Sequence, residues 1–347
     1  MRFVLAALLW VFASPVAAQY WASQEACAFD PKAQYGDGFE RDVLKELTAT
    51  ARQTQNGLGR YWKITAPNGA VSHLLGTWHS TRIEVLNLPD QVEAEIARAR
   101  LVAPEIVYTQ GDRNAVTLRL KADGFFRDPN RPFQLEDYGF PDEVNLWIRQ
   151  RTDAIGWDGA AGDFLTPYGL LSLLFSHPCD DFAYGFYPIL DDRIQMLGEL
   201  GGAQLLSLEP PEALQRHLMK NQDSGLAEAM ILNFASYLNP ELYAPGTPDL
   251  VNYYLWGEIG FLRAWDLKVV EMAMEPVLAE EVLRRTDDYL IDERNANFLQ
   301  KIRPELEKGS VFKAVGAFHL PGPKGLVTLL RSLGFEVVRV PLPGECL

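Results

Sequence analysis

Cysteine and histidine are both scarce in this chain, which has three cysteines and five histidines in 347 residues. Three cysteines are too few for a disulfide scaffold, and at least one of Cys27, Cys179 and Cys346 must stay outside any intramolecular disulfide. The sequence does not choose among the three pairings, so all three residues are disulfide candidates. None of them lies in a pattern that would activate a catalytic thiol.

Long apolar segments and clusters of basic residues are also missing. A membrane-spanning helix needs about 20 consecutive apolar residues, and no segment reaches that length, so we expect no membrane span. The formal net charge is −14 and the chain has no run of lysine or arginine. This charge argues against nucleic acids and anionic membrane surfaces as partners. The composition leaves the oligomeric state open.

Three common catalytic motifs are absent as well. Without a Gly-x-Ser-x-Gly elbow, a serine hydrolase of the α/β-hydrolase type is not supported. Without a His-Glu-x-x-His helix or a phosphate-binding loop, the corresponding zinc peptidases and nucleotide hydrolases are not supported either. Any chemistry must therefore come from other residues.

The amino terminus has the pattern of a secretory signal peptide. Arg2 supplies a positive charge, residues 3–13 are apolar, and small residues precede a cleavage position after Ala18. We therefore expect residues 1–18 to be removed and the mature protein to be exported, either to the periplasm or out of the cell.

The rest of the chain is expected to form one α/β domain behind a short N-terminal segment. Residues 19–56 contain one helix, as the helical spacing of their apolar residues indicates. Residues 57–347 predict a central mixed, largely parallel sheet flanked by helices. Residues 123–190, rich in aromatic residues, proline, glycine and aspartate, predict a helical and irregular insertion that covers part of this core. Strands are expected at residues 61–65, 70–75, 101–108, 203–209, 311–315 and 335–340.

Two of the histidines occupy the same local pattern at opposite ends of the chain. His79 and His319 each follow an apolar strand and a glycine, Gly76 or Gly316, with two residues between glycine and histidine. Glycine lets the backbone turn sharply or approach a ligand closely. Polar side chains just beyond strand ends line the crevice where α/β proteins bind ligands. Either histidine alone could equally be a hydrogen-bonded structural residue.

Other polar groups are expected at the same edge of the sheet. Glu105 and Glu209 lie at strand ends, and Gly322 begins an expected helix whose free N–H groups would favour an oxyanion. Two imidazoles and a carboxylate can bind a divalent ion that keeps an open position and activates water. Ligand type does not distinguish zinc, manganese, cobalt and iron. Taken alone, Glu105 could equally be an exposed or salt-bridged carboxylate.

Seven sequence blocks occur in the order and rough spacing of one protein family. Together they cover roughly residues 60–340, and the last block is the most specific. The chain resembles the TraB/GumN proteins, the bacterial relatives of the Tiki metalloproteases, in the blocks LLGTWH, LVAPE, ILDDRI, LLSLEP, WGE, ERNANF and VGAFHLPGPKGLVTLLRSLGFEVVRV.

The resemblance implies an α/β fold like that of the erythromycin esterases and the ChaN-like haem-binding proteins. It also implies a metal-dependent peptidase or hydrolase site in which His79, Glu105 and His319 match the metal-binding positions. Arg294 and Asn295 match an Arg-Asn pair of the family. The metal implied is a divalent transition metal such as manganese, cobalt or zinc.

Two acidic residues complete the expected site. Asp191 and Glu209 match acidic positions of the family, and either is a candidate general base. Arg294 or the helix start at Gly322 would stabilise the oxyanion, although Arg294 could instead pair with a carboxylate. The first hypothesis is an exported metal-dependent hydrolase acting on a peptide or small-molecule substrate. The alternative is a non-catalytic periplasmic binding protein for a peptide, a haem or a metal.

Overall fold

The computed structural model describes most of the chain in seven segments. They are residues 27–107, 134–154, 159–175, 178–180, 188–221, 224–244 and 246–345. The expected signal peptide, Cys346 and several parts of the expected insertion lie outside these ranges. Within them, no helix combines the length and the apolar character needed to cross a membrane.

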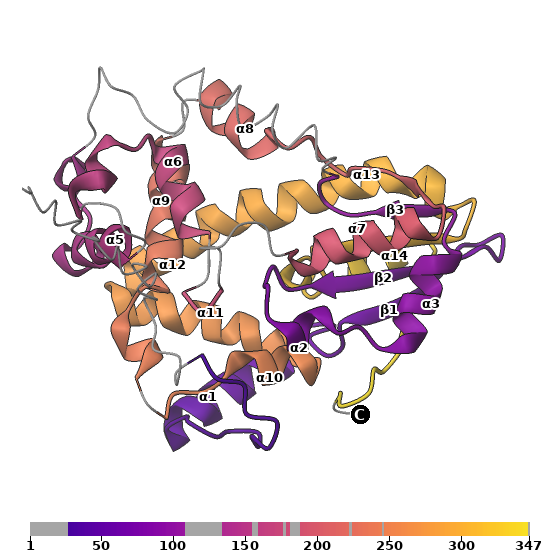
Figure 1. Cartoon of the computed structure of the whole chain (residues 1–347), viewed down its shortest axis with the longest axis horizontal. Coiled ribbons are helices and arrows are strands. Elements are labelled where there is room, and N and C mark those ends of the chain that lie inside the picture. The colour runs from indigo at the N-terminus through magenta and orange to yellow at the C-terminus, as the bar shows by residue number, and fades with distance from the viewer. Residues whose placement is uncertain are drawn as a thin grey trace, which may run out of the picture.

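A six-stranded mixed sheet forms the centre of the α/β part of the molecule (Figure 1). Its strands are β1 (Tyr61–Thr65), β2 (Val71–Thr77), β3 (Leu101–Ala103), β4 (Gln204–Leu205), β5 (Val311–Gly316) and β6 (Glu336–Arg339), in the spatial order β4-β3-β5-β2-β1-β6. β5 is parallel to both of its neighbours, β3 and β2, and β4 is parallel to β3. β1 pairs antiparallel with β2 and with β6. The mixed, largely parallel α/β sheet expected from the sequence is confirmed.

Helices surround this sheet and extend well beyond it. They are α1 (Arg41–Gln53), α2 (Ile83–Leu86), α3 (Asp90–Arg98), α5 (Asp142–Ala154), α6 (Pro167–Leu174), α7 (Leu190–Leu200), α8 (Ala213–Asn221), α9 (Ser224–Ser236), α10 (Leu250–Leu255), α11 (Ile259–Ala273), α12 (Pro276–Asp287), α13 (Arg294–Leu306) and α14 (Leu326–Ser332). Short 3₁₀ turns occur at Leu135–Tyr138, Gly159–Phe164, Pro240–Tyr243 and Ala317–His319. A π-helical turn, Asp288–Glu293, joins α12 directly to α13.

Alternate residues of β5 point to opposite faces of the sheet. Phe312 and Ala314 pack in a cluster with α3, α7, α10 and α11, whereas Val311 and Val315 pack with α13 and α14. Both faces are therefore covered, as expected for a central strand with parallel neighbours. Burying each large apolar side chain stabilises the fold by roughly 1.5–3 kcal/mol. This packing fixes the strand whose carboxyl end carries the second histidine motif.

A separate hydrophobic cluster holds the helices on the other side of the molecule. It joins α5 and α6, from the expected insertion, to α9, α11 and α12, which come later in the chain. Figure 1 shows this helical side next to the sheet, with α11 and α13 reaching from one side to the other. The described part of the expected insertion thus packs against later helices.

Two strands are shorter, and one helix begins later, than the sequence predicts. β3 ends at Ala103 rather than near residue 108, because Pro104 has no N–H to donate to a neighbouring strand. β4 has only two residues rather than the expected seven. α14 begins at Leu326, a few residues later than expected. The early end of β3 leaves Glu105 just beyond the strand, at the edge of the sheet.

Candidate functional site

His79, Glu105 and His319 come together where three neighbouring parallel strands end. They follow β2, β3 and β5, and β5 lies between the other two. A methyl group placed on Gly316 would lie 3.4 Å from Oε1 of Glu105, 3.6 Å from Cδ2 of His319 and 3.9 Å from Nε2 of His79. The three predicted metal-binding side chains therefore converge on the open space beside Gly316.

Glu105 is the most strongly held carboxylate of the group. It is buried, and its Oε1 accepts a hydrogen bond from the Gly316 N–H at 2.7 Å. Its Oε2 lies 2.5 Å from Nη2 of Arg294, and its Oε1 lies 3.4 Å from Nε2 of His319. Burial alone would raise the pKa of Glu105. Arg294, the two nearby histidines and the Gly316 N–H lower it by more, so that the pKa lies well below its usual value. The side chain is therefore an ionised carboxylate.

Arg294 joins Glu105 to Glu209. Its Nε lies 3.1 Å from both carboxylate oxygens of Glu209, and its Nη1 donates to the Leu290 carbonyl at 3.2 Å. Burial lowers the pKa of Arg294, but the two carboxylates raise it above its usual value. Burial raises the pKa of Glu209, with Arg294 opposing the rise. Both oxygens of Glu209 bind this guanidinium. Arg294 lines the cavity described below, whereas Glu209 does not.

Asn295 sets the tautomer of His319. Its Nδ2 donates to the carbonyls of His319 and Lys324 at 3.2 and 3.0 Å, so its Oδ1 must be the acceptor 2.8 Å from Nδ1 of His319. The proton of the neutral imidazole is therefore on Nδ1, and Nε2 carries the lone pair that a metal ion can use. Burial lowers the pKa of His319 to about 3, with Glu105 opposing and Arg294 adding to the effect.

His79 forms a pair with Asp191 at the start of α7. Its Nε2 lies 3.5 Å from Oδ2 of Asp191, and Thr77 donates to Oδ1 of the same carboxylate at 3.1 Å. Oδ2 is buried and has no hydrogen-bond partner among the described residues. The His79 side chain is 51% exposed. Desolvation by the surrounding protein lowers its pKa, but Asp191 and Glu105 raise it by more, so that it lies above its usual value. A proton is therefore readily held between this imidazole and this carboxylate.

The motif glycines have different physical roles. A Cβ on Gly76 would lie 2.6 Å from Cδ1 of Leu320 and 2.9 Å from Cα of Ala317, so only glycine lets β2 approach the turn after β5 this closely. Gly316 leaves space between the converging side chains. Gly322 does not have the role expected of it, because its N–H donates to the Gln55 carbonyl at 2.7 Å and is not free to face a ligand.

These side chains open into a cavity of about 330 Å³ between the sheet and the helical side. His79, Glu105, Arg294, Gly316 and His319 line the end that faces the sheet, whereas neither Asp191 nor Glu209 is among the lining residues. Aromatic side chains form much of the remaining wall, namely Trp78, Phe175, Phe234, Tyr237, Tyr254, Trp265 and Phe318.

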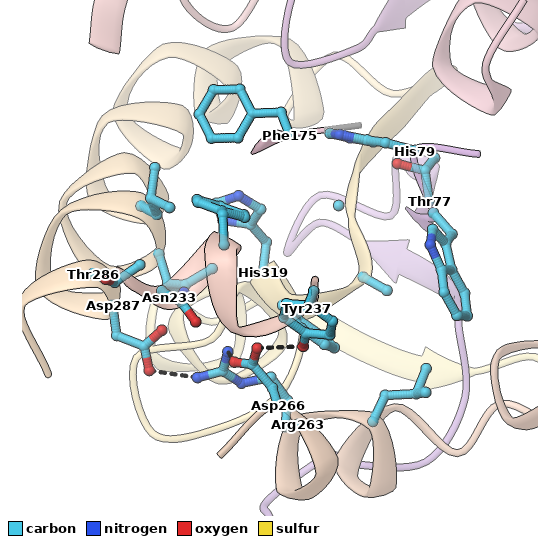
Figure 2. A pocket seen from close by; sticks show the side chains of 18 of the residues that line it. Thr77, His79, Phe175, Asn233, Tyr237, Arg263, Asp266, Thr286, Asp287 and His319 are labelled. Atoms are coloured by element: carbon cyan, nitrogen blue, oxygen red, sulfur yellow. Dashed lines mark hydrogen bonds and ion pairs between the residues drawn. The ribbon is translucent and has the colours of Figure 1, made fainter. Parts of the chain in front are cut away.

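The opposite wall of the cavity carries a polar network from Tyr237, which directly follows α9, and from α11 and α12 (Figure 2). Tyr237 donates to Oδ1 of Asp266 at 2.5 Å, and Arg263 bonds Oδ2 of Asp266 at 3.0 Å. The same guanidinium bonds Asp287. Sequence reasoning missed this network, as it missed two further lining residues, Asn233 and Thr286. The one available signal was Asn233, an amide inside the apolar run of residues 230–235.

A disulfide holds the loop beside His79. Cys27 is bonded to Cys179, which selects one of the three pairings that the sequence allowed. The next residue, Asp180, accepts hydrogen bonds from the Ser80 hydroxyl at 2.6 Å and the Thr81 N–H at 3.0 Å. The loop that follows the first histidine motif is therefore tied to the amino-terminal end of the described chain.

The donor atoms at the edge of the sheet, imidazole nitrogens and carboxylate oxygens, are of the types that bind divalent metal ions. They include Nε2 of His319 with its lone pair, the oxygens of the ionised Glu105, the Nε2 of His79 and the unpartnered Oδ2 of Asp191. In the segments that the structure describes, no three of the histidine, cysteine, aspartate and glutamate side chains are already at metal-binding spacing. Arg294 lies among them, with Nη1 3.4 Å from Nε2 of His319, and offsets the carboxylate charge.

The chain is therefore an α/β protein whose histidines and acidic side chains meet at the carboxyl ends of parallel strands. The model of the TraB/PrgY/gumN family matches residues 61–339, which include every strand of the sheet and both histidine motifs. The chain belongs to this family, which confirms the resemblance recognised in its sequence. Comparisons with curated proteins and with solved structures gave no match.

Proposed function

We propose that this protein is an exported, metal-dependent hydrolase that acts on peptide or amide bonds. The observation that carries the proposal is the convergence of His79, Glu105 and His319 beside Gly316 at the end of a mostly apolar cavity. The site lies where open α/β sheets bind ligands, and the cavity gives a substrate access to it.

His79, Glu105 and His319 would hold the ion, which would be manganese, cobalt or zinc. Asp191 would stay free to act as a base, because its Oδ2 lies beside His79 and has no hydrogen-bond partner among the described residues. Asn295 supports this assignment by directing the lone pair of His319 towards Glu105. A divalent ion bound there would act as a Lewis acid on the scissile carbonyl and lower the pKa of water.

The chain's own groups can manage the proton and the charge of such a reaction. Hydrolysis joins the oxygen of water to the carbonyl carbon, breaks the C–N bond and delivers a proton to the leaving amine. Oδ2 of Asp191, which has no hydrogen-bond partner among the described residues, can accept that proton from water and return it to the amine. Arg294 lines the cavity and can stabilise negative charge on the carbonyl oxygen. Glu209 is bound by Arg294 through both oxygens, which favours Asp191 over Glu209 as the general base.

Two features support export. Residues 1–18 have the pattern of a signal peptide. The bond between Cys27 and Cys179 is of the kind that persists in oxidising compartments. Both are consistent with a periplasmic or secreted hydrolase.

The test is metal content by mass spectrometry on protein purified without chelator or nickel affinity. We expect about one transition metal ion per chain, lost in the His79→Ala/His319→Ala double variant. His217→Ala is the matched control, because His217 lies on α8 and does not line the cavity. The metal-loaded protein should then release amine from peptides. No metal in the wild-type protein after addition of manganese, cobalt or zinc would contradict the proposal.

The aromatic wall of the cavity favours one alternative, a binding protein for a peptide, a haem or a metal that performs no hydrolysis. Trp78 lines the cavity beside His79 and packs edge-on against Tyr254, so a flat or apolar ligand has surfaces to contact. Tight binding of a peptide with no product after prolonged incubation with metal would select this alternative.

A further inference from the structure

The cavity wall opposite His79 contains polar groups that the proposed reaction does not use. Asn233 and Thr286 line the cavity and are only 6% and 2% exposed. Oδ1 of Asn233 and Oγ1 of Thr286 are buried and have no hydrogen-bond partner among the described residues. Buried polar atoms in proteins nearly always have partners, so each one left without a partner needs an explanation. A ligand group in the cavity would supply the missing partner.

The same wall carries an excess of negative charge. Arg263 is bonded to both Asp266 and Asp287, so one guanidinium faces two carboxylates. Asp287 follows Thr286 on α12 and also lines the cavity. Burial raises the pKa of Asp287 despite the neighbouring Arg263, as expected for an incompletely compensated carboxylate. A cationic group bound at this wall would balance the charge.

The three acceptors belong to two helices in contact. Asn233 is on α9 and the other two residues are on α12, and these helices pack together. Figure 2 shows Asn233, Thr286 and Asp287 grouped on one side of the pocket and His79 with Thr77 on the other. A primary ammonium has three N–H donors, and a carboxamide oxygen, a hydroxyl and a carboxylate can each accept one of them.

We propose that Asn233, Thr286 and Asp287 form a subsite for a primary ammonium group, with the amino terminus of a short peptide as its ligand. The apolar side chain next to that terminus would contact the aromatic wall of the cavity, for example Phe234 and Trp265. The choice of a peptide rests on the proposed function, whereas recognition of the ammonium group does not require hydrolysis.

The test is calorimetric binding to the full mature chain in the presence of a chelator, so that no turnover occurs. The probes are leucyl-phenylalaninamide, its N-acetyl derivative, and N-acetyl-lysyl-phenylalaninamide, whose ammonium is on a side chain. We expect the free amino terminus to bind at least about tenfold more tightly than the acetylated probe, because acetylation removes the charge and two donors. Tight binding of the lysyl probe would support the subsite and identify a lysine side chain as its ligand.

Two variants test which residues are responsible. Asn233→Leu and Thr286→Val should each weaken binding of the free amino terminus by about tenfold and leave the acetylated probe unchanged. Ser236→Ala is the matched control on α9, since its hydroxyl donates to the Leu232 carbonyl and does not line the cavity. Thermal unfolding of each variant checks that the fold is intact.

Equal affinities for all three probes, or variants that bind like the Ser236→Ala control, would overturn the inference. Its failure is distinguishable from failure of the proposed function. A protein that prefers the free amino terminus but hydrolyses no peptide keeps the subsite and loses the hydrolase. A metal-dependent peptidase that does not prefer the free amino terminus would keep the hydrolase and lose the subsite.

Discussion

Arg294 binds Glu105 from a position 189 residues later in the chain, with Nη2 2.5 Å from Oε2. The same guanidinium binds Glu209, and all three side chains are at most 15% exposed. Glu105 and Glu209 are also joined through their backbones, because the Glu209 N–H donates to the Glu105 carbonyl at 2.9 Å. Without Arg294, two carboxylates would lie next to each other in a buried site without the guanidinium that binds them both.

Replacing Arg294 with glutamine should therefore destabilise the protein strongly. We expect a loss of about 3–5 kcal/mol in the free energy of unfolding, because removing one partner leaves buried charges uncompensated. Urea unfolding measures the effect. The control is Arg284→Gln, which breaks the exposed pairs with Glu281 and Asp288 and should cost less than about 1 kcal/mol. Similar losses in the two variants would contradict this account of the site.

Gly316→Ala should separate metal binding from stability. The added methyl group would have no neighbour closer than 3.4 Å, which is ordinary van der Waals contact, so we expect a stability change within about 1 kcal/mol. The same methyl would lie between Glu105, His79 and His319 and should weaken metal binding by at least about 100-fold. Metal titration and thermal unfolding of the same sample measure both effects. Unchanged metal affinity would place the ion elsewhere.

Asn295→Ala should weaken metal binding through the tautomer of His319. Without an acceptor at Nδ1, the imidazole can carry its proton on Nε2, the nitrogen that would bind the ion. We expect a loss of about 10–100-fold in affinity, measured by competition with a chromogenic chelator. Asn252→Ala is the control, because this buried amide bonds the Asp30 carbonyl instead. Equal affinities in the two variants would show that Asn295 does not direct the lone pair.

Lys313 should make stability depend on pH in the alkaline range. Its amine is buried without a hydrogen-bond partner among the described residues, and burial lowers its pKa from 10.5 to about 7, with Glu105 opposing. Below about pH 7 the folded and unfolded chains both carry the ammonium, and the full cost of its burial applies. Between pH 7 and 10.5 only the unfolded chain keeps the proton, so this contribution to stability rises with pH.

Lys313→Met should therefore be more stable than the wild type at or below pH 7, on the order of 5 kcal/mol for a pKa that burial lowers from 10.5 to about 7. The difference should shrink as the pH approaches 10.5. Urea unfolding at several pH values measures it. A difference that stays constant with pH, or a less stable variant, would show that the amine has a partner in solution.

Local patterns in the sequence were enough to predict much of the sheet. The β1–β2 hairpin was predictable because Pro67-Asn68-Gly69 forms a turn between two alternating runs. The Gly-x-x-His pattern shared by His79 and His319 predicted that both follow the ends of strands. These strands, β2 and β5, are parallel neighbours. β4 was overestimated because apolar residues continue beyond its two paired positions. The segment after it still donates hydrogen bonds to the Val102 and Pro104 carbonyls.

The contacts of the site were less predictable because they depend on pairs that are distant in sequence. The sequence suggested that Arg294 could pair with a carboxylate, yet it gave no means of choosing Glu105 and Glu209 as its partners. The wall formed by Asn233 and Thr286 depends on how α9 meets α12. Asn233 lies in a largely buried helix, and Thr286 lies on the buried face of α12 with Ala279 and Val282. The sequence therefore gives no sign that either polar side chain lines a cavity.

The bond between Cys27 and Cys179 spans 152 residues of sequence. Cys179 follows Pro178, which lines the cavity, and precedes Asp180, which holds the loop after His79. Oxidation of two thiols therefore fastens one rim of the cavity. In a reducing environment the chain would lack this fastening. The fixed position of this rim therefore depends on the oxidation state of two cysteines that are far apart in the sequence.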